Sequence, residues 1–267
     1  MNQPIGVIDS GVGGLTVLHE LKRQLPREKF IYLGDTKRCP YGSRTSEEVV
    51  TFTWELVDFL MGYDIKMLIV ACNTATAVVL QQLKEQLDIP VIGVIEPGAR
   101  AAIKSTNTNH IAIIGTENTI LSRSYDVALK EINPELQTIS VACPLFVPLI
   151  ESGKYSKREA KEVVDKSLRA IKKDQLVDTL ILGCTHYPIL QSVIEEVVGE
   201  SITVLSSALE TGAEVSTVLT FSQMHNVMDQ DPQAPEIYVT GDLQSVKPLI
   251  EEFFQFKSSI VKQVTLA

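Results

Sequence analysis

Short apolar runs rich in β-branched residues alternate with longer amphipathic stretches along the chain. Each run ends in a polar or glycine-bearing turn, which is typical of strands buried on both faces of a sheet. The predicted strands are Ile5–Ile8, Phe30–Leu33, Met67–Val70, Val91–Val94, Ile111–Ile114, Thr138–Val141, Thr179–Leu182 and Ile202–Leu205. Apolar positions at helical spacing predict helices between them, such as Thr45–Met61 and Ser156–Lys173. The alternation predicts an α/β protein with mostly parallel sheets flanked by helices.

A weak internal repeat divides these elements into two halves. Ile5–Ser10 aligns with Ile111–Thr116, and Met67–Thr74 aligns with Thr179–His186 at a similar offset. Any two α/β units share some of this pattern, but the conserved order and spacing of the strands favour a true repeat. We therefore expect two pseudo-symmetric domains, each with a cysteine directly after its third strand, and an active site in the cleft between them.

Turn signals set the predicted limits of the two domains. Glu96-Pro97-Gly98 is expected to be a turn that closes the first half, and the second half ends near Ser206-Ser207. The remaining tail has two helix patterns (Ala208–Leu219 and Leu243–Phe254), one strand (Glu236–Thr240) and a polar surface loop (225–235). This tail is too short for a third domain. We expect residues 1–97 plus 208–267 to form the first domain and residues 98–207 to form the second.

Charge and composition narrow the class of protein. The 267 residues include 24 Lys or Arg and 33 Asp or Glu, which gives a formal net charge of −9. This balance disfavours a nucleic-acid partner, which requires a basic face, but it allows a small amide-lined pocket for an anion. We find no signal-peptide pattern and no apolar run long enough to cross a bilayer, so we expect a cytoplasmic protein without a membrane partner. The four cysteines should then be reduced thiols.

Two polar clusters follow the first two predicted strands, at the edge where open α/β sheets bind ligands. Asp9-Ser10-Gly11-Val12-Gly13-Gly14 is consistent with a dinucleotide loop, a plain turn, or a nest of amides that binds a carboxylate. The charge of Asp9 disfavours the first of these. The second cluster combines Gly34-Asp35-Thr36 with Cys39-Pro40-Tyr41-Gly42-Ser43, and it is alternatively an ordinary turn that caps the next helix. Cys39 has no neighbour in sequence that suggests chemistry.

Two cysteines occupy equivalent places in the repeat, within Cys72-Asn73-Thr74 and Cys184-Thr185-His186. A thiol between a buried strand and a helix N-terminus is favoured as the thiolate, so we expect its pKa to fall from about 8.5 toward neutrality. One such cysteine would most simply be a small buried hydrophobe, but a matched pair with polar neighbours favours chemistry. Two facing thiols can remove a proton from one side of a carbon and return one to the other side, which inverts the stereocentre.

Other chemistries are less well supported by the spacing. Cys184 and His186 alone are too few ligands for a metal site. Cys143 has no polar companions and is expected in the core. A nucleotide-dependent oxidoreductase and a non-catalytic binding protein for acidic metabolites remain as alternatives from other functional classes.

At these positions the sequence resembles the glutamate racemases of the cofactor-independent aspartate/glutamate racemase superfamily. The matching segments are 8–17, Gly34-Asp35-Thr36, Pro40-Tyr41-Gly42, Ala71-Cys72-Asn73-Thr74-Ala75, Pro144-Leu145, Glu151-Ser152-Gly153 and 182–188. One departure is Ser206-Ser207, where the family often has an aspartate before the serine, and we expect it to affect only the local hinge. The nearest alternative is an aspartate racemase or another amino-acid racemase of the same superfamily.

The resemblance implies an isomerase that interconverts L- and D-glutamate and supplies D-glutamate for peptidoglycan and cell-wall biogenesis. It implies no pyridoxal phosphate, no metal and no nucleotide, and it implies a homodimer. Cys184 would act on L-glutamate with help from His186 and Glu151, and Cys72 would act on D-glutamate with help from Asp9. The substrate-binding residues that the resemblance implies are Asp9, Ser10, Tyr41, Gly42, Asn73, Thr74, Thr116, Thr185 and His186.

Overall fold

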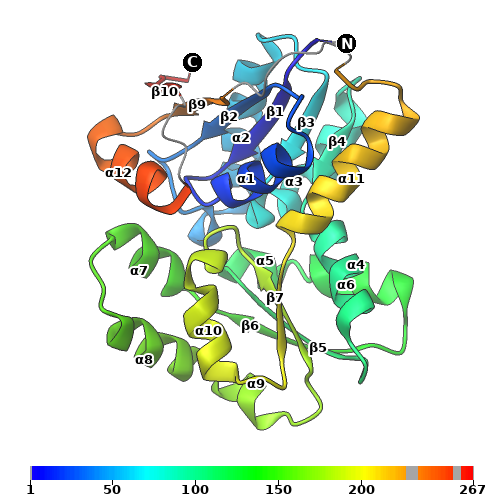
Figure 1. Cartoon of the computed structure of the whole chain (residues 1–267), viewed down its shortest axis with the longest axis vertical. Coiled ribbons are helices and arrows are strands. Elements are labelled where there is room, and N and C mark those ends of the chain that lie inside the picture. Colours follow the sequence, from blue (N-terminus) through cyan, green and yellow to red (C-terminus); the bar gives the residue numbers. More distant parts are fainter. Residues whose placement is uncertain (1, 227–233, 255–259, 267) are drawn as a thin grey trace.

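A computed structural model describes residues 2–226, 234–254 and 260–266 of the protein. It consists of two parallel sheets flanked by helices (Figure 1). The first sheet has the strand order β10-β9-β2-β1-β3-β4, and the second has the order β6-β5-β7-β8. The strands are β1 (Ile5–Asp9), β2 (Phe30–Gly34), β3 (Met67–Val70), β4 (Val91–Gly93), β5 (His110–Gly115), β6 (Gln137–Ala142), β7 (Thr179–Gly183), β8 (Thr203–Ser206), β9 (Glu236–Val239) and β10 (Ile260–Gln263). The predicted α/β class is confirmed.

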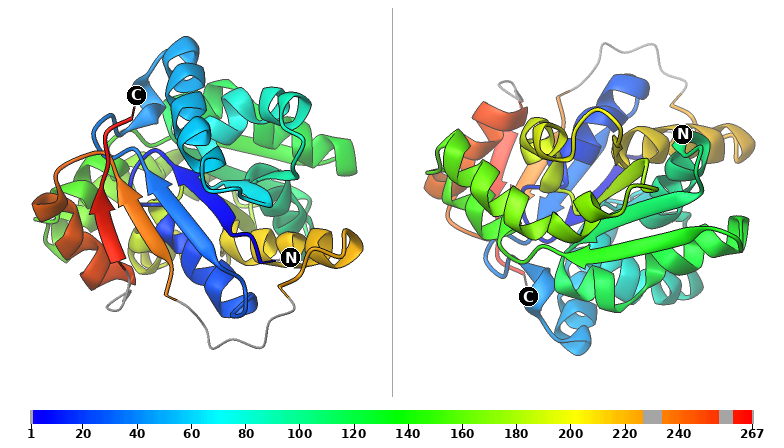
Figure 2. Two further views of the ribbon diagram at one scale, coloured as in Figure 1. Left: turned by 90° about the horizontal axis from the view of Figure 1, so that it is seen from above. Right: turned by 90° about the horizontal axis from the view of Figure 1, so that it is seen from below.

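The order β2-β1-β3-β4 of the first sheet is repeated as β6-β5-β7-β8 in the second. The expected pseudo-symmetry is therefore confirmed, and β3 and β7, the third strands of the two halves, occupy equivalent places. The tail extends the first sheet, because β9 pairs with β2 and β10 pairs with β9, both in parallel (Figure 2). The sequence analysis did not predict β10, whose four residues are mostly exposed and carry little apolar signal.

Burial differs between the central strands and the edge strands of the second sheet, whereas β4, at one edge of the first sheet, is fully buried. β1, β2, β3 and β7 are buried along their whole lengths, as predicted. β6 and β8, at the two edges of the second sheet, are partly exposed, so the expectation of burial on both faces is wrong for them. An edge strand has a neighbour on one side only, and the helices cover it less completely.

The helices cover both faces of each sheet. They are α1 (Leu15–Gln24), η1 (Tyr41–Ser43), α2 (Ser46–Met61), α3 (Asn73–Gln86), α4 (Ile95–Ser105), α5 (Glu117–Leu121), α6 (Ser124–Ile132), α7 (Phe146–Ser152), α8 (Lys157–Ser167), α9 (Arg169–Lys173), η2 (Tyr187–Leu190), α10 (Gln191–Val198), α11 (Ala208–Phe221) and α12 (Leu243–Phe254). In the first sheet, α1, α11 and α12 share one core, and α2 and α3 share the other. In the second, α7, α8 and α10 pack on one face, and α4 and α6 on the other.

Two local predictions about helices are wrong. The single helix expected over Ser156–Lys173 is divided into α8 and α9 at Leu168, whose ψ of 11° is not helical. Just before this break, the hydroxyl of Ser167 donates to the carbonyl of Val163, a contact that bends helices. The turn expected at Glu96-Pro97-Gly98 is instead the first part of α4, because a proline in the first helical turn needs no N–H partner. The predicted domain limit at 97/98 falls inside α4 and the one at 207/208 falls directly before α11. Both limits stay predictions.

A buried ion pair holds the start of the tail against the first sheet. Lys66 Nζ lies 2.6 Å from Glu28 Oε2 and donates to the carbonyl oxygen of Met224 at 2.7 Å. The amide of Asn226 donates to the other oxygen of Glu28 at 2.8 Å. The predicted loop at 225–235 lies largely outside the described residues. None of the helices that the structure describes has both the length and the apolar composition needed to span a bilayer.

Candidate active site

A small cavity lies where the carboxyl ends of the two sheets meet. Its walls are Ser10, Pro40, Tyr41, Gly42, Cys72, Asn73, Thr74, Thr116, Val147, Cys184, Thr185 and His186. The predicted site residues are therefore brought together, except that Asp9 and Glu151 lie behind this wall and contact Thr185 and His186. The volume of this cavity is about 10 Å³, which is room for about one water molecule.

Cys72 lies two residues after the end of β3 and caps the N-terminus of α3. Its Sγ accepts from the amide of Ala75 at 3.4 Å and lies 3.5 Å from Ser10 Oγ. Burial and the nearby charge of Asp9 nevertheless raise the pKa of the Cys72 thiol to about 12. The expected lowering of this pKa is therefore wrong, because loss of hydration outweighs the helix N-terminus. Cys72 is a thiol at neutral pH.

Cys184 follows β7 in the equivalent position but has different neighbours. Its Sγ lies 3.9 Å from His186 Nδ1, and the opposite ring nitrogen, Nε2, lies 3.0 Å from Glu151 Oε1. Burial acts to lower the pKa of His186, but the hydrogen bonds with Cys184 and Glu151 outweigh it and raise the pKa to about 10. Burial acts to raise the pKa of Glu151, but the same imidazole lowers it overall. The imidazole of His186 thus links Glu151 to Cys184.

The glycine-rich loop after β1 binds a carboxylate, and that carboxylate is Asp9 itself. The amide of Gly11 donates to Asp9 Oδ2 at 2.9 Å, and Thr185 Oγ1 donates to Oδ1 at 3.2 Å. Burial raises the pKa of Asp9 against the opposing effects of His186 and the amides of Gly11 and Gly14. The amides that were predicted to bind a ligand carboxylate thus position Asp9 instead. With Asp9 held there, the loop gives little support to the dinucleotide-binding alternative.

Close backbone contact joins the two halves of the site. A side chain at Gly13 would place its Cβ 2.4 Å from His186 Nδ1, and one at Gly42 would lie 2.4 Å from Thr116 Cβ. Either substitution would push His186 or Thr116 out of place. These two glycines therefore permit the loops of the first sheet to reach residues of the second.

Hydroxyl and amide groups of the cavity wall form a connected network across the two sheets. Thr74 Oγ1 and Thr116 Oγ1 are 2.9 Å apart. Tyr125, on α6, donates its hydroxyl proton to Asn73 Oδ1 at 2.7 Å and so fixes the orientation of that amide. Asn73 Nδ2 is buried and has no hydrogen-bond partner, which leaves it as a donor at the cavity wall. Sequence reasoning missed Tyr125.

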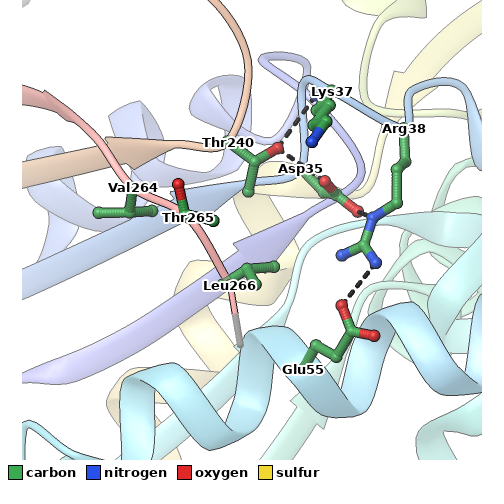
Figure 3. A pocket seen from close by; sticks show the side chains of 8 residues that line it. All are labelled: Asp35, Lys37, Arg38, Glu55, Thr240, Val264, Thr265 and Leu266. Carbon is green, nitrogen blue, oxygen red and sulfur yellow. Dashed lines mark hydrogen bonds and ion pairs between the residues drawn. The ribbon is translucent and has the colours of Figure 1, made fainter.

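Asp35 stabilises the turn that carries Tyr41. Its two carboxylate oxygens accept from the Tyr41 hydroxyl at 2.6 Å and from Thr240 Oγ1 at 2.7 Å. Arg38 bridges Asp35 and Glu55 on the far side, where a second pocket of about 130 Å³ lies beneath the C-terminal segment (Figure 3). Asp35 therefore supports the site from behind.

Cys39, for which the sequence suggested no partner, belongs to this site. Its Sγ lies 3.1 Å from Glu151 Oε1, the same oxygen that contacts His186. No local signal could have revealed this contact, since 112 residues separate the two positions. Cys143, in contrast, lies in the core of the second sheet, as expected.

Comparison with known proteins is consistent with this geometry. The model of the Asp/Glu/Hydantoin racemase family matches residues 5–211. A glutamate racemase from Oceanobacillus iheyensis is 56% identical over 272 residues, covering 100% of this chain and 98% of its own.

Two solved structures show the same fold. The crystal structure of a glutamate racemase isoform from Bacillus anthracis superposes with a TM-score of 0.95 at 45% identity, covering 99% of this chain and 98% of the other. The structure of a glutamate racemase from Francisella tularensis in complex with D-glutamate superposes with a TM-score of 0.90 at 32% identity, with the same coverage. The chain belongs to the Asp/Glu/Hydantoin racemase family.

Proposed function

We propose that this protein is a glutamate racemase, an isomerase that interconverts L- and D-glutamate through two cysteine side chains. The observation that carries the proposal is the placement of Cys72 and Cys184 at equivalent strand ends around one cavity. Glutamate racemases that match over the whole chain support the choice of substrate, and one of them is described in complex with D-glutamate.

The surroundings of the two thiols suggest complementary roles. In the L-to-D direction, the thiolate of Cys184 removes the α-proton of L-glutamate, and the thiol of Cys72 donates its proton to the opposite face. The enzyme is left with a Cys184 thiol and a Cys72 thiolate, and turnover of D-glutamate reverses both transfers. His186, positioned by Glu151, assists Cys184, and Asp9 lies near Cys72 to assist it.

Stabilisation of the deprotonated substrate carbon is the harder part of the reaction. General acid–base catalysis contributes about 10²–10⁴-fold, so fixed donors must stabilise the charge that develops on the substrate carboxylate. The free Nδ2 of Asn73 is available for this purpose at the cavity wall, and the hydroxyls of Thr74 and Thr116 line the same wall. Thr185 also lines it, with its hydroxyl on Asp9. Ser10, Tyr41 and Gly42 complete the proposed substrate-binding surface.

Substrate entry requires the cavity to enlarge. Space for about one water molecule is far too small for glutamate, so we propose that the two sheets move apart to admit the substrate and close over it to exclude water. Small-angle scattering with and without saturating glutamate tests this motion. Identical profiles would contradict it.

The decisive experiment is exchange of the α-proton in D₂O, followed by NMR, with wild type, Cys72→Ser and Cys184→Ser. Each serine variant should lose racemisation in both directions, because a single remaining base can serve only one face. Cys143→Ala, which removes a thiol outside the site, is the matched control. Wild-type turnover in either serine variant would contradict the two-thiol mechanism, and absence of solvent deuterium in wild type would favour a binding protein.

Substrate choice and biological setting complete the proposal. Circular dichroism of L-glutamate and L-aspartate after incubation distinguishes the two racemase activities, and loss of signal with aspartate alone would favour the aspartate alternative. We further propose that the enzyme acts in the cytoplasm as a homodimer and supplies D-glutamate to peptidoglycan synthesis. Light scattering of the purified protein tests the dimer, and rescue of a D-glutamate auxotroph tests the supply.

A further inference from the structure

Cys39 has no part in the proposed proton transfer, yet its thiol lies in a compact group of potential metal ligands. Its Sγ is 3.1 Å from Glu151 Oε1, which is 3.0 Å from His186 Nε2. The sulfur, oxygen and nitrogen atoms all lie within 4.8 Å of one another. In the part of the chain that the structure describes, no other group of three His, Cys, Asp or Glu side chains brings its ligand atoms so close.

The chemistry of these three ligands suits zinc. Thiolate, imidazole and carboxylate bind zinc with bonds of about 2.0–2.3 Å, which in a tetrahedral site places the ligand atoms about 3.3–3.6 Å apart. Two of the three contacts are already slightly shorter than this, so a small rotation of the side chains would accommodate the ion. Three protein ligands also leave the fourth position for water.

Access and orientation are also suitable. The side chain of Glu151 is 30% exposed and Cys39 is partly exposed, so an ion can enter from the solvent side. His186 is buried on the inner side and turns Nε2 toward the group, while Nδ1 faces Cys184. The group therefore reaches from the surface to the neighbour of a proposed catalytic thiol.

We propose that Cys39, Glu151 and His186 form a zinc-binding site and that zinc bound there stops racemisation. Zinc displaces the thiol proton of Cys39 and any proton on His186 Nε2, both of which are released to solvent, and it binds Sγ, Nε2 and a carboxylate oxygen. The ion then holds both Nε2 and Glu151, so the direct contact by which Glu151 positions His186 beside Cys184 is broken. The inhibition rests on the proposed function, whereas the binding does not.

Binding is tested directly on the purified full chain after removal of metals. Cobalt, which replaces zinc in such sites, should give a thiolate-to-metal absorption band, and zinc affinity is measured by competition with a chromophoric chelator. Loss of a partner beyond the ligands costs about 10–100-fold in affinity, so loss of the ligand in Cys39→Ser should cost about 100-fold or more and abolish the band. Cys143→Ala should retain both.

The two readouts separate failure of this site from failure of the proposed function. If the cobalt band depends on Cys39 but metal-free wild type does not racemise glutamate, the site stands and the function fails. If Cys39→Ser binds zinc as tightly as wild type, other thiols hold the ion and the proposal is wrong. Absence of zinc binding to wild type would also overturn it. The zinc concentration that halves racemisation should shift by the same factor as the affinity.

Discussion

The Glu151→Gln substitution tests whether this carboxylate acts on Cys184 through His186. The pKa of His186 is raised from 6.5 to about 10, against the effect of burial, by hydrogen bonds and charges of Cys184 and Glu151. At about 1.4 kcal/mol per pKa unit, the preference for imidazolium is on the order of 5 kcal/mol. Glutamine retains the size and one acceptor oxygen of the side chain but removes its charge.

Glu151 is one of the two partners that raise this pKa, so we assign it roughly half of the preference, about 2 kcal/mol. Its loss weakens the imidazolium of His186 by this amount, which corresponds to about 30-fold. Because His186 assists Cys184 in the proposed removal of the α-proton, kcat/KM should fall by about the same factor. Since the two enantiomers are equally stable in water, kcat/KM must fall equally in both directions.

Circular dichroism of glutamate, monitored from the L and the D enantiomer, measures both rates. Glu162→Gln is the matched control, because this carboxylate of α8 is 71% exposed and forms an ion pair with Arg158 on the same helix, away from the site. Thermal unfolding of both variants checks that the fold persists. If Glu151→Gln retained kcat/KM within about twofold of wild type, the proposed coupling through His186 would be wrong.

Three further substitutions test the network and the fold. Tyr125→Phe frees the amide of Asn73 and should lower kcat/KM by about fivefold, mainly through KM, since a neutral hydrogen bond contributes about 1 kcal/mol. Lys66→Ala leaves Glu28 buried without its cation and should destabilise the protein by about 3–5 kcal/mol in urea unfolding, whereas the double replacement Lys66→Met with Glu28→Gln should lose much less. Burial acts to raise the pKa of Asp178, but hydrogen bonds from Thr106 and the two amides that follow it lower this pKa to about 2. The ionised carboxylate therefore stabilises the fold above about pH 4, and this stabilisation is lost as the pH falls toward 2. Because solvent screens this carboxylate, Asp178→Asn should cost about 1 kcal/mol at pH 7. In urea unfolding, the variant should lose less stability than wild type as the pH falls from 4 to 2.

Central strands could be predicted from the sequence because both of their faces are buried. β3 has the predicted limits of Met67–Val70, since every residue in it packs against helices. β10 was missed and β6 was expected to be fully buried, because edge strands carry polar residues and lack a continuous apolar run. The beginning of α4 was misassigned because proline and glycine are common both in turns and in first helical turns.

The two cysteines could be placed from the sequence because the repeat puts them at equivalent strand ends. The surroundings of the two thiols, and so their pKa values, could not be predicted in the same way. A helix terminus contributes about 0.3–1 kcal/mol, whereas full burial shifts a pKa by several units, so the direction predicted for Cys72 was wrong. The contact of Cys39 with Glu151 depends on tertiary packing between distant loops, which sequence periodicity does not report.

The fold is symmetric around the reaction, but the surroundings of the two thiols are not. Burial and Asp9 raise the pKa of the Cys72 thiol, whereas Cys184 lies beside His186, which Glu151 holds from the other side. In the proposed reaction L-glutamate requires the form with the proton on Cys72, and D-glutamate requires the form with that proton moved to Cys184. Because kcat/KM is equal for the two enantiomers, any preference between these two forms must change kcat and KM by the same factor. Asymmetry between the thiols therefore sets which enantiomer saturates the enzyme first, while kcat/KM stays equal for the two enantiomers whatever its absolute value.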